Sequence, residues 1–423
     1  MLLRERKTVT GTGFKRSLLG ILTAAVLLCG CMAVESSRSG NENTTVTGER
    51  SSGYVSRTMP NREQSTAPTE TFNIPKSAQL VTENMTDAQK RTLSDIYRRI
   101  SDFEDDIALD GSVISREDIS DFIGIILSQM PYIDYIGSEY SINVDKNGNV
   151  TNLRLNYSMT KDEAKIKKAM LDQKLDDIMS GVNEGWSDYK KVLYFHDTII
   201  DSCQYSESGS APHSAYGCLI EGMAVCEGYT KAMQLLCARA DIDCVCVSGF
   251  ASDEQGPQPH IWNKIMIEDE WTNIDVTWDD PMTASGSPYR RYDYFGLTDE
   301  EISITHEPDD NRYITYPAAR SEALGYYIRM GYYYDGVTSA YDVMQYAAVS
   351  SMTDGDYAAR IKCSDADHYN QAVSELFDDY TGYGAEIYNI LYDAVSQTGA
   401  GWATNEFALV KNDGLYTITV FFR

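Results

Sequence analysis

The stretch that decides the fold runs from residue 221 to residue 280. It reads EGMAVCEGYTKAMQLLCARADIDCVCVSGF over 221–250 and, after a short polar loop, HIWNKIMIEDEWTNIDVTWDD over 260–280. Apolar residues follow Cys226 at helical spacing, so a helix is expected to begin there. Because the dipole of a helix favours negative charge at its N-terminus, the Cys226 sulfur would lie where its reactive thiolate is stabilised.

Three β-like runs follow this helix, over 244–250, 260–267 and 271–278. His260 opens the second run and Asp275 lies within the third. Alternation along the third run is expected to place three polar residues on one face: Asn273, Asp275 and Thr277. A helix followed by three strands predicts an α+β core.

Three local strings, AVCEGYTKAM, HIWNKI and IDVTWDDP, resemble the bacterial form of the transglutaminase-like superfamily, which comprises papain-like cysteine enzymes. The order Cys226, His260, Asp275 and the separations of 34 and 15 positions also resemble that family, from about Asp188 to about His306. The resemblance implies a core in which a helix bearing the cysteine packs on an antiparallel sheet bearing the histidine and the aspartate.

A catalytic triad is what the resemblance implies for these residues. His260 would take the proton of the Cys226 thiol, and Asp275 would accept a hydrogen bond from the other ring nitrogen. The thiolate would attack an amide carbonyl, and backbone N–H groups at the helix start would stabilise the oxyanion. Taken singly, the three residues are a buried thiol, a strand histidine and a turn acid. Their order and spacing favour a triad, for which no cofactor is expected.

Four further residues are candidates for the neighbourhood of the triad. Gln204 and Tyr205 follow a predicted helix and could contact the oxyanion or the substrate. Glu227 could bind a cationic substrate group or simply favour the helix N-terminus. Trp262 would belong to the core or to the cleft wall. His196, a lone histidine beside buried positions, is expected to be structural.

The acceptor of the acyl group decides the reaction, since water gives hydrolysis and an amine gives transfer. Three functions therefore stay open. The first is a surface-anchored peptidase or amidase acting on protein or cell-wall peptide, the second a protein-glutamine gamma-glutamyltransferase, and the third a noncatalytic binding module. Hydrolysis is favoured because nothing in the sequence marks a dedicated amine site.

The charge balance of the chain limits the kinds of partner that it can bind. The 423 residues include 36 basic and 63 acidic ones, which gives a formal net charge of −27. Phosphate binding needs clustered Lys and Arg, so this balance argues against a nucleic-acid partner. The sequence indicates no particular oligomeric state.

The N-terminus predicts export and a lipid anchor. Basic residues precede a mostly apolar run over 18–28 that is shorter than the roughly 20 residues needed to span a bilayer. The run ends in LCGC at 28–31, which resembles a bacterial lipobox and implies lipidation of Cys31. The expected location is the extracytoplasmic face of the cell membrane, with an exported protein or peptide as substrate. A soluble secreted protein or an uncleaved anchor is the alternative.

The chain divides into five predicted segments. Residues 1–31 form the signal peptide, and 32–78, rich in small polar residues, a disordered tether. Residues 79–182 form an N-terminal α+β domain that is mainly helical, 183–315 the catalytic core, and 316–423 a small C-terminal α+β domain.

Local signals predict some elements of the flanking domains. Thr86 with Gln89 and Thr160 with Glu163 have the spacing of capping boxes ahead of helices. A strand is expected over 326–334, and a hairpin is expected to turn at the sequence Asn-Asp-Gly near the C-terminus.

Nine cysteines become seven once the two in the lipobox are discounted. An odd number fits one free thiol, Cys226. Cys203 and Cys218 are the candidate disulfide, with buried packing as the alternative. Buried free thiols are expected at three others: Cys237, Cys244 and Cys246. No spacing in the chain is typical of a metal site, so no metal is expected.

Overall fold

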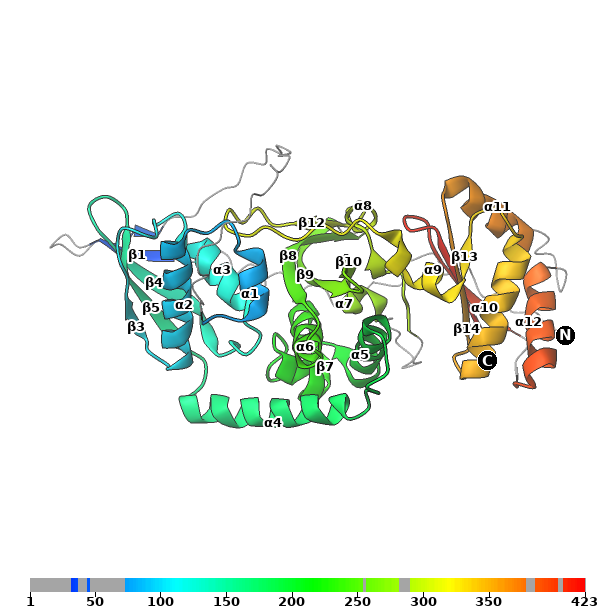
Figure 1. Ribbon diagram of the computed structural model, residues 1–423, viewed down its shortest axis with the longest axis horizontal. Helices are drawn as coiled ribbons and strands as arrows, with labels where there is room; N and C mark the ends of the chain where they lie inside the picture. Colours follow the sequence, from blue (N-terminus) through cyan, green and yellow to red (C-terminus); the bar gives the residue numbers. More distant parts are fainter. Residues whose placement is uncertain are drawn as a thin grey trace.

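The computed structural model describes seven stretches of the chain: 32–36, 44–45, 73–253, 256–280, 290–377, 385–401 and 406–422. They form three parts in a row along the longest axis (Figure 1). An N-terminal part with its own sheet lies at one end, the segment with the candidate triad lies in the middle, and a C-terminal part with another sheet lies at the other end.

The middle part is an antiparallel sheet with helices against it, which confirms the expected α+β core. Its strand order is β11-β10-β9-β8-β12, and every neighbouring pair is antiparallel. The strands have these bounds: β8 Cys244–Asp253, β9 Gly256–Ile267, β10 Glu270–Ile274, β11 Phe295–Leu297 and β12 His306–Pro308.

Helix α6 (Cys226–Arg239) begins at the expected residue and is buried along most of its length. It lies against the sheet on one side, with α5 (Asp188–Ser202) also packed against it. Ser187 caps α5, because its side chain accepts a hydrogen bond from the backbone of Lys190. Four short elements complete the region: β6 Gln204–Tyr205, π-helix η3 Gly217–Glu221, β7 Met223–Ala224 and α8 Asp299–Ile302.

The third predicted strand is wrong beyond residue 274. Strand β10 ends at Ile274, and Asp275 is the N-cap of the short helix α7 (Val276–Asp279). The carboxylate of Asp275 accepts hydrogen bonds from the backbone of Thr277 at 2.9 Å and of Trp278 at 3.2 Å. Capping by a short acidic side chain therefore replaces strand pairing, and the expected alternation does not apply past the strand end. Likewise, His260 lies inside β9 and does not open it.

The N-terminal part combines helices with a sheet, as expected of a mainly helical α+β domain, and more of its described residues lie in helices than in strands. Its five-stranded sheet has the order β2-β1-β4-β5-β3. The strands are β1 Met32–Ser36, β2 Thr44–Thr45, β3 Asp106–Ala108, β4 Ile136–Val144 and β5 Val150–Tyr157. The helices are α1 Lys76–Val81, α2 Asp87–Ser101, α3 Ile119–Gln129 and α4 Lys161–Met179. Both predicted capping boxes are confirmed, at the starts of α2 and α4.

Strands β1 and β2 come from the segment expected to be a tether, and β1 pairs with β4 in parallel. The rest of that segment up to residue 72 lies outside the described residues, as do the predicted signal peptide and Cys31. The domain boundaries predicted from the sequence therefore stay predictions.

A buried glutamine attaches the N-terminal part to the central sheet. The side-chain amide of Gln129, at the end of α3, donates to the carbonyl of Cys246 at 2.6 Å and accepts from its N–H at 3.2 Å. Helix α4 runs beneath both parts (Figure 1), and Asp172 on it pairs with Arg239 of α6 at 2.7 Å. These contacts hold the N-terminal part against β8 and α6.

The C-terminal part has a four-stranded sheet of order β13-β14-β16-β15. Its strands are β13 Tyr333–Tyr334, β14 Ala358–Cys363, β15 Phe407–Asn412 and β16 Thr417–Phe422. Its helices are α9 Tyr326–Met330, α10 Ala340–Asp354, α11 Ala366–Phe377 and α12 Glu386–Thr398. The hairpin of β15 and β16 confirms the expected turn.

The strand predicted over 326–334 is wrong. Most of it is α9, which ends at Met330 and is capped by Gly331 in the left-handed conformation with φ of 73°, and a two-residue strand follows. Tyr326 stacks on Tyr292 of the middle part, with ring centroids 3.8 Å apart. Packing of the tyrosines between the two parts therefore decides the local structure over their strand propensity.

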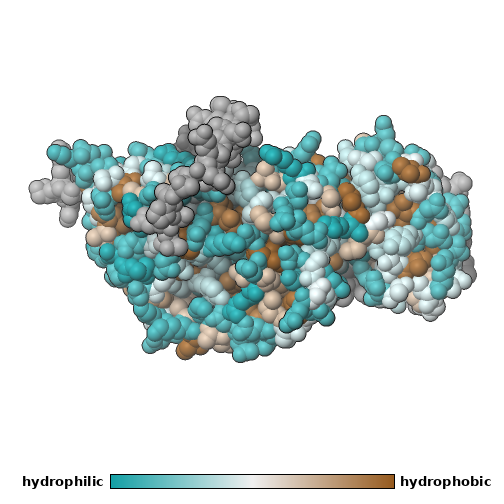
Figure 2. Space-filling view, viewed as in Figure 1, coloured by the Kyte–Doolittle hydropathy of each residue, from teal (hydrophilic) through white to brown (hydrophobic). Residues whose placement is uncertain are grey.

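Mixed polarity characterises the surface. Figure 2 shows hydrophilic residues over most of one face, with apolar residues in small scattered groups. Among the described residues, no helix is both long and apolar enough to cross a membrane. The seven cysteines from Cys203 to Cys363 are all free thiols, so the predicted disulfide between Cys203 and Cys218 is wrong. Their side chains are hydrogen-bond partners, and both are buried in the core.

Candidate active site

Cys226 is the first residue of α6, and its free thiol is half-buried. Val225 before it offers no side-chain acceptor to cap the helix. The first N–H groups of a helix have no partner one turn back within the helix. That of Gly228 donates to the carbonyl of Val225 at 2.9 Å, so those of Cys226 and Glu227 are the candidate donors beside the sulfur. Gly228 lets the helix start approach the preceding loop, because a Cβ there would lie 2.6 Å from that of Ala224 and 2.9 Å from the carbonyl oxygen of Pro212.

His260 and Asp275 form a buried pair. The Nε2 atom of His260 lies 2.6 Å from Oδ2 of Asp275, and the two side chains are 8% and 1% exposed. Burial opposes charge on the ring, but the charge of Asp275 and hydrogen bonds with Asp275 and Cys226 raise the pKa of His260 to about 10. The pKa of Asp275 is lowered, because the nearby histidines outweigh the effect of burial. At neutral pH the pair therefore consists of an imidazolium and a carboxylate.

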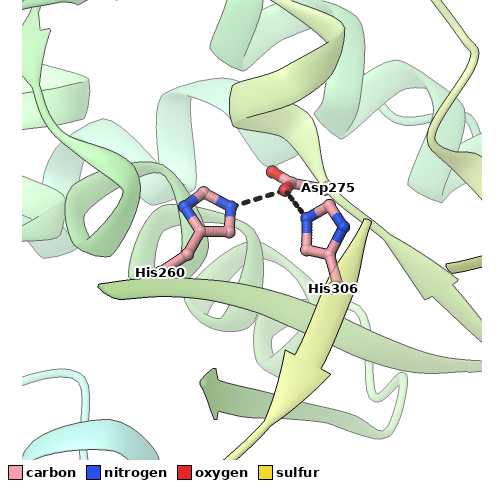
Figure 3. A group of neighbouring side chains, drawn as sticks. All are labelled: His260, Asp275 and His306. Carbon is pink, nitrogen blue, oxygen red and sulfur yellow. Dashed lines mark hydrogen bonds and ion pairs between the residues drawn. The ribbon is translucent and has the colours of Figure 1, made fainter. Parts of the chain in front are cut away.

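A second histidine, which the sequence did not single out, shares the same carboxylate oxygen. Nε2 of His306 lies 3.0 Å from Oδ2 of Asp275, and Nδ1 lies 2.8 Å from the Thr305 hydroxyl. Figure 3 shows the two rings approaching Asp275 from different strands, His260 from β9 and His306 from β12. The signal available was slight: the chain has only five histidines, and this one closes the stretch that resembles the family.

The same three side chains, His260, Asp275 and His306, are a candidate group of metal ligands, with ligand atoms within 4.8 Å of one another. The separations of 2.6 and 3.0 Å are those of hydrogen bonds. Ligands around a tetrahedral zinc ion, each about 2.1 Å from the metal, would be roughly 3.4 Å apart. The other oxygen of Asp275 is already engaged by backbone amides. The geometry therefore fits a hydrogen-bonded cluster better than a metal site.

Glu227, next to the candidate nucleophile, faces basic groups of the protein itself. Its carboxylate lies 2.7 Å from Nζ of the buried Lys231 and 3.2 Å from Nδ1 of His213. Although burial acts in the opposite direction, Lys231 and His213 lower the pKa of Glu227 to about 2. The two oxygens are thus already paired within the protein, and Glu227 also lies in the first turn of α6, where an acid is favourable.

The other three candidates have different surroundings. Trp262 is buried and donates to Oδ1 of Asn273 at 3.1 Å, so it belongs to the core behind His260. Tyr205 is half-buried, and burial together with the nearby Cys226 raises its pKa. Gln204 is exposed beside it on β6, which pairs with β7 just before α6. Tyr205 is therefore the better placed of the two for contact with substrate.

His196, expected to be structural, is fully buried between two carboxylates. Its Nδ1 lies 3.0 Å from Asp197 and its Nε2 lies 3.1 Å from Asp279, the last residue of α7. Burial opposes protonation, but the hydrogen bonds and charges of the two aspartates raise the pKa of His196 to about 9. Both ring nitrogens are occupied, so this side chain has no atom to offer a substrate.

Residues 176–276 match the family model of the transglutaminase-like superfamily. The matched segment begins in α4 and ends one residue past Asp275, and it contains Cys226 and His260. The middle of this chain is therefore a transglutaminase-like domain, a class that is consistent with a cysteine peptidase or transferase.

The chain is similar to the mouse (Mus musculus) kyphoscoliosis peptidase, with 26% identity over 98 residues, covering 21% of this chain and 15% of that protein. The chain thus spans only a small part of this relative. Among solved structures, it is similar to one described as a TGase, with TM-score 0.24, 11% identity and coverage of 37% of this chain and 54% of that one. A candidate cysteine protease from Cytophaga hutchinsonii matches with TM-score 0.24, 18% identity and coverage of 33% and 61%.

Proposed function

We propose that this protein is a cysteine hydrolase that cleaves amide bonds in protein or cell-wall peptides through a thioester on Cys226. The observation that carries the proposal is the arrangement around His260. One ring nitrogen is held by Asp275 at 2.6 Å, and the Cys226 side chain is the other hydrogen-bond partner of the ring. A thiol, an imidazole and a carboxylate in this order form the triad of cysteine peptidases.

The steps follow from these positions. In the reactive ion pair the thiol proton of Cys226 already lies on His260, and the Cys226 thiolate attacks the amide carbonyl carbon. Amides at the start of α6 stabilise the oxyanion. The imidazolium then gives its proton to the leaving amine, which departs as the C–N bond breaks. Water, deprotonated by His260, attacks the thioester and releases the acid and the thiol.

The test compares wild type, Cys226→Ala and Cys237→Ala. Cys237 is a free, buried thiol on the same helix and serves as the matched control. Each protein is incubated with a mixture of peptides containing glutamine and cell-wall peptides, with and without a primary amine, and the products are weighed by mass spectrometry. We expect cleavage products from wild type and Cys237→Ala only. Conjugates with the amine in place of cleavage would indicate a transferase, and equal results for all three proteins would indicate a binding module.

We also propose that the enzyme works outside the cytoplasm, attached to the cell membrane by a lipid on Cys31. The support is the LCGC string at residues 28–31 after an apolar run. A mass spectrum of the mature N-terminus should show diacylglycerol on Cys31, and Cys31→Ala should abolish it. An unmodified mature N-terminus would contradict the anchor without affecting the proposed chemistry.

A further inference from the structure

We infer that His306 is a positioning residue of the proposed triad, which holds the carboxylate of Asp275 in its ionised form and aimed at His260. This inference rests on the proposed function, because it assigns a role toward the same three residues. His306 lies outside the segment that matches the family model.

Four donors surround the two oxygens of Asp275. Oδ2 receives His260 at 2.6 Å and His306 at 3.0 Å, while Oδ1 receives the backbone N–H groups of Thr277 and Trp278. Without His306, Oδ2 of Asp275 would keep only the hydrogen bond with His260, the ring that takes part in proton transfer in the proposed mechanism. The second imidazole adds a fixed donor at that oxygen, and so sets the direction in which Asp275 faces His260.

The tautomer of His306 follows from its partners. An ionised carboxylate only accepts hydrogen bonds, so Nε2 of His306 carries the proton that faces Asp275. Nδ1 then accepts from the Thr305 hydroxyl, 2.8 Å away. Burial lowers the pKa of His306 although Asp275 acts in the opposite direction. The ring is therefore a neutral donor at neutral pH.

The surroundings of His306 leave few other titratable groups to act on it. Asp275 is its partner, the His260 ring lies 5.3 Å away and the Tyr294 ring 5.6 Å away between centroids. Two indole rings pack against it at 5.0 and 4.7 Å: those of Trp262 and Trp278. This apolar packing fixes the ring plane without competing for its nitrogens.

The backbone also holds His306 in place. Strand β12 pairs with β8, with His306 opposite Ala251 and Pro308 opposite Gly249. A Cβ at Gly249 would collide with the carbonyl oxygen of Glu307 and lie 2.8 Å from Cα of Pro308. The close approach that this glycine permits therefore sets the position of the short strand that carries the histidine.

The test measures the reactivity of Cys226 toward iodoacetamide as a function of pH, which requires no substrate. A peptide mass spectrum assigns the alkylation to Cys226. In His306→Phe we expect the pH of half-maximal alkylation to rise by about one unit, and the rate at pH 6 to fall by about tenfold, because a misaligned Asp275 stabilises the His260 imidazolium less. His306→Gln, whose amide N–H can replace Nε2–H, should recover most of the wild-type profile.

The matched control is His368→Gln, since His368 also pairs with an aspartate, Asp365 at 2.8 Å, but in the C-terminal part. It should leave the profile unchanged. If His306→Phe does not fold by circular dichroism, Thr305→Val, which removes the partner of Nδ1, is expected to shift the profile in the same direction by a smaller amount.

The outcomes separate the two proposals. A wild-type Cys226 that reacts as an ordinary thiol, half-maximally near pH 8.5, would contradict the proposed function itself. A wild-type profile displaced to low pH, together with an unchanged profile in folded His306→Phe, would overturn only the role of His306. Equal shifts in His306→Phe and His306→Gln would also overturn it, because a donor would then make no difference.

Discussion

Two buried histidines lie at opposite ends of helix α7. Each has one ring nitrogen bonded to an aspartate of that region, and they differ in the partner of the other ring nitrogen. His260 is bonded to Asp275, the N-cap of the helix, and its other partner is the Cys226 side chain. His196 is bonded to Asp279, the last residue of the helix, and its other nitrogen meets Asp197. Both have a raised pKa because they face carboxylates. A histidine between two carboxylates can only hold charge, whereas one between a carboxylate and a thiol can move a proton.

Helix α7 connects the two histidines. Its four residues end in the buried Asp279 and are preceded by the buried N-cap Asp275, and the backbone N–H of Asp279 donates to the carbonyl of Asp275 at 3.2 Å. The carboxylate of Asp279 also accepts from the backbone of Tyr294 at 2.9 Å. The pair of His196 and Asp279 therefore anchors the segment on which the candidate catalytic acid lies, without contacting the reacting atoms.

The largest expected effect is a difference in activity between substitutions of Asp275 and of Asp279. In Asp275→Asn, the amide can donate to Nε2 of His260, which forces the proton onto Nδ1 and removes the base that Cys226 needs. We expect cleavage to fall by about 10³–10⁴-fold. In Asp279→Asn, the triad keeps its partners, so we expect a loss of less than about tenfold. Both rates are measured with a peptide identified as a wild-type substrate.

Stability provides the control for this pair. Both variants lose a buried charge, so the free energy of unfolding, measured with denaturant, is expected to be lower than in wild type by about 1–3 kcal/mol for each. If Asp275→Asn and Asp279→Asn lost activity equally at equal stability, His260 could not be distinguished as catalytic from His196 as structural.

The residues of the proposed triad could be named from the sequence because thiol chemistry restricts residue types, order and spacing. The role of Asp275 as an N-cap could not be read from the same letters, since polar and apolar residues alternate from Asn273 to Trp278 without a break at Ile274. Hydrogen bonds to two amides ended the strand there. Alternation reports burial, and it does not say where local capping takes over from strand pairing.

The role of His306 could not be predicted from the sequence, for a different reason. It lies 31 positions after Asp275 and on the opposite edge of the sheet from β11. Strand β12 reaches the site through its pairing with β8, which in turn pairs with β9, and no local pattern in the sequence predicts that pairing. The disulfide predicted between Cys203 and Cys218 failed similarly, because counting cysteines gives candidates for pairing but not the chemistry of a buried thiol pair.

A second, smaller effect is the pH dependence of the stability that the pair of His196 and Asp279 contributes. The pKa of His196 is about 9 in the folded protein and about 6.5 when unfolded, so its stabilising contribution is complete below pH 6.5 and is lost as the pH rises through 9. The shift corresponds to about 3 kcal/mol. Burial also raises the pKa of Asp279, to about 6, so this acid is ionised over that range.

The matched reference for this effect is the double variant His196→Gln with Asp279→Asn, which replaces the charged pair by two neutral amides. Denaturant unfolding is measured at pH 6 and at pH 9.5. The difference in free energy of unfolding between wild type and the double variant should become smaller by about 3 kcal/mol at the higher pH. A difference that does not change with pH would mean that His196 is not charged in the folded protein.

The smallest expected effect lies at the outer edge of the same cluster. Arg290 pairs with Asp197 at 3.3 Å and with Asp201 at 2.5 Å, and its side chain is 33% exposed. Solvent screens such pairs, so Arg290→Ala should lower the free energy of unfolding by less than about 1 kcal/mol. Its backbone carbonyl still accepts from the buried Arg360 at 2.9 Å, so the contact with the C-terminal part is kept. The free energy of unfolding is measured at low and at high salt. A loss above about 2 kcal/mol that salt does not reduce would contradict the expectation. It would mean that Asp197 needs Arg290 as well as His196 as a partner for its carboxylate.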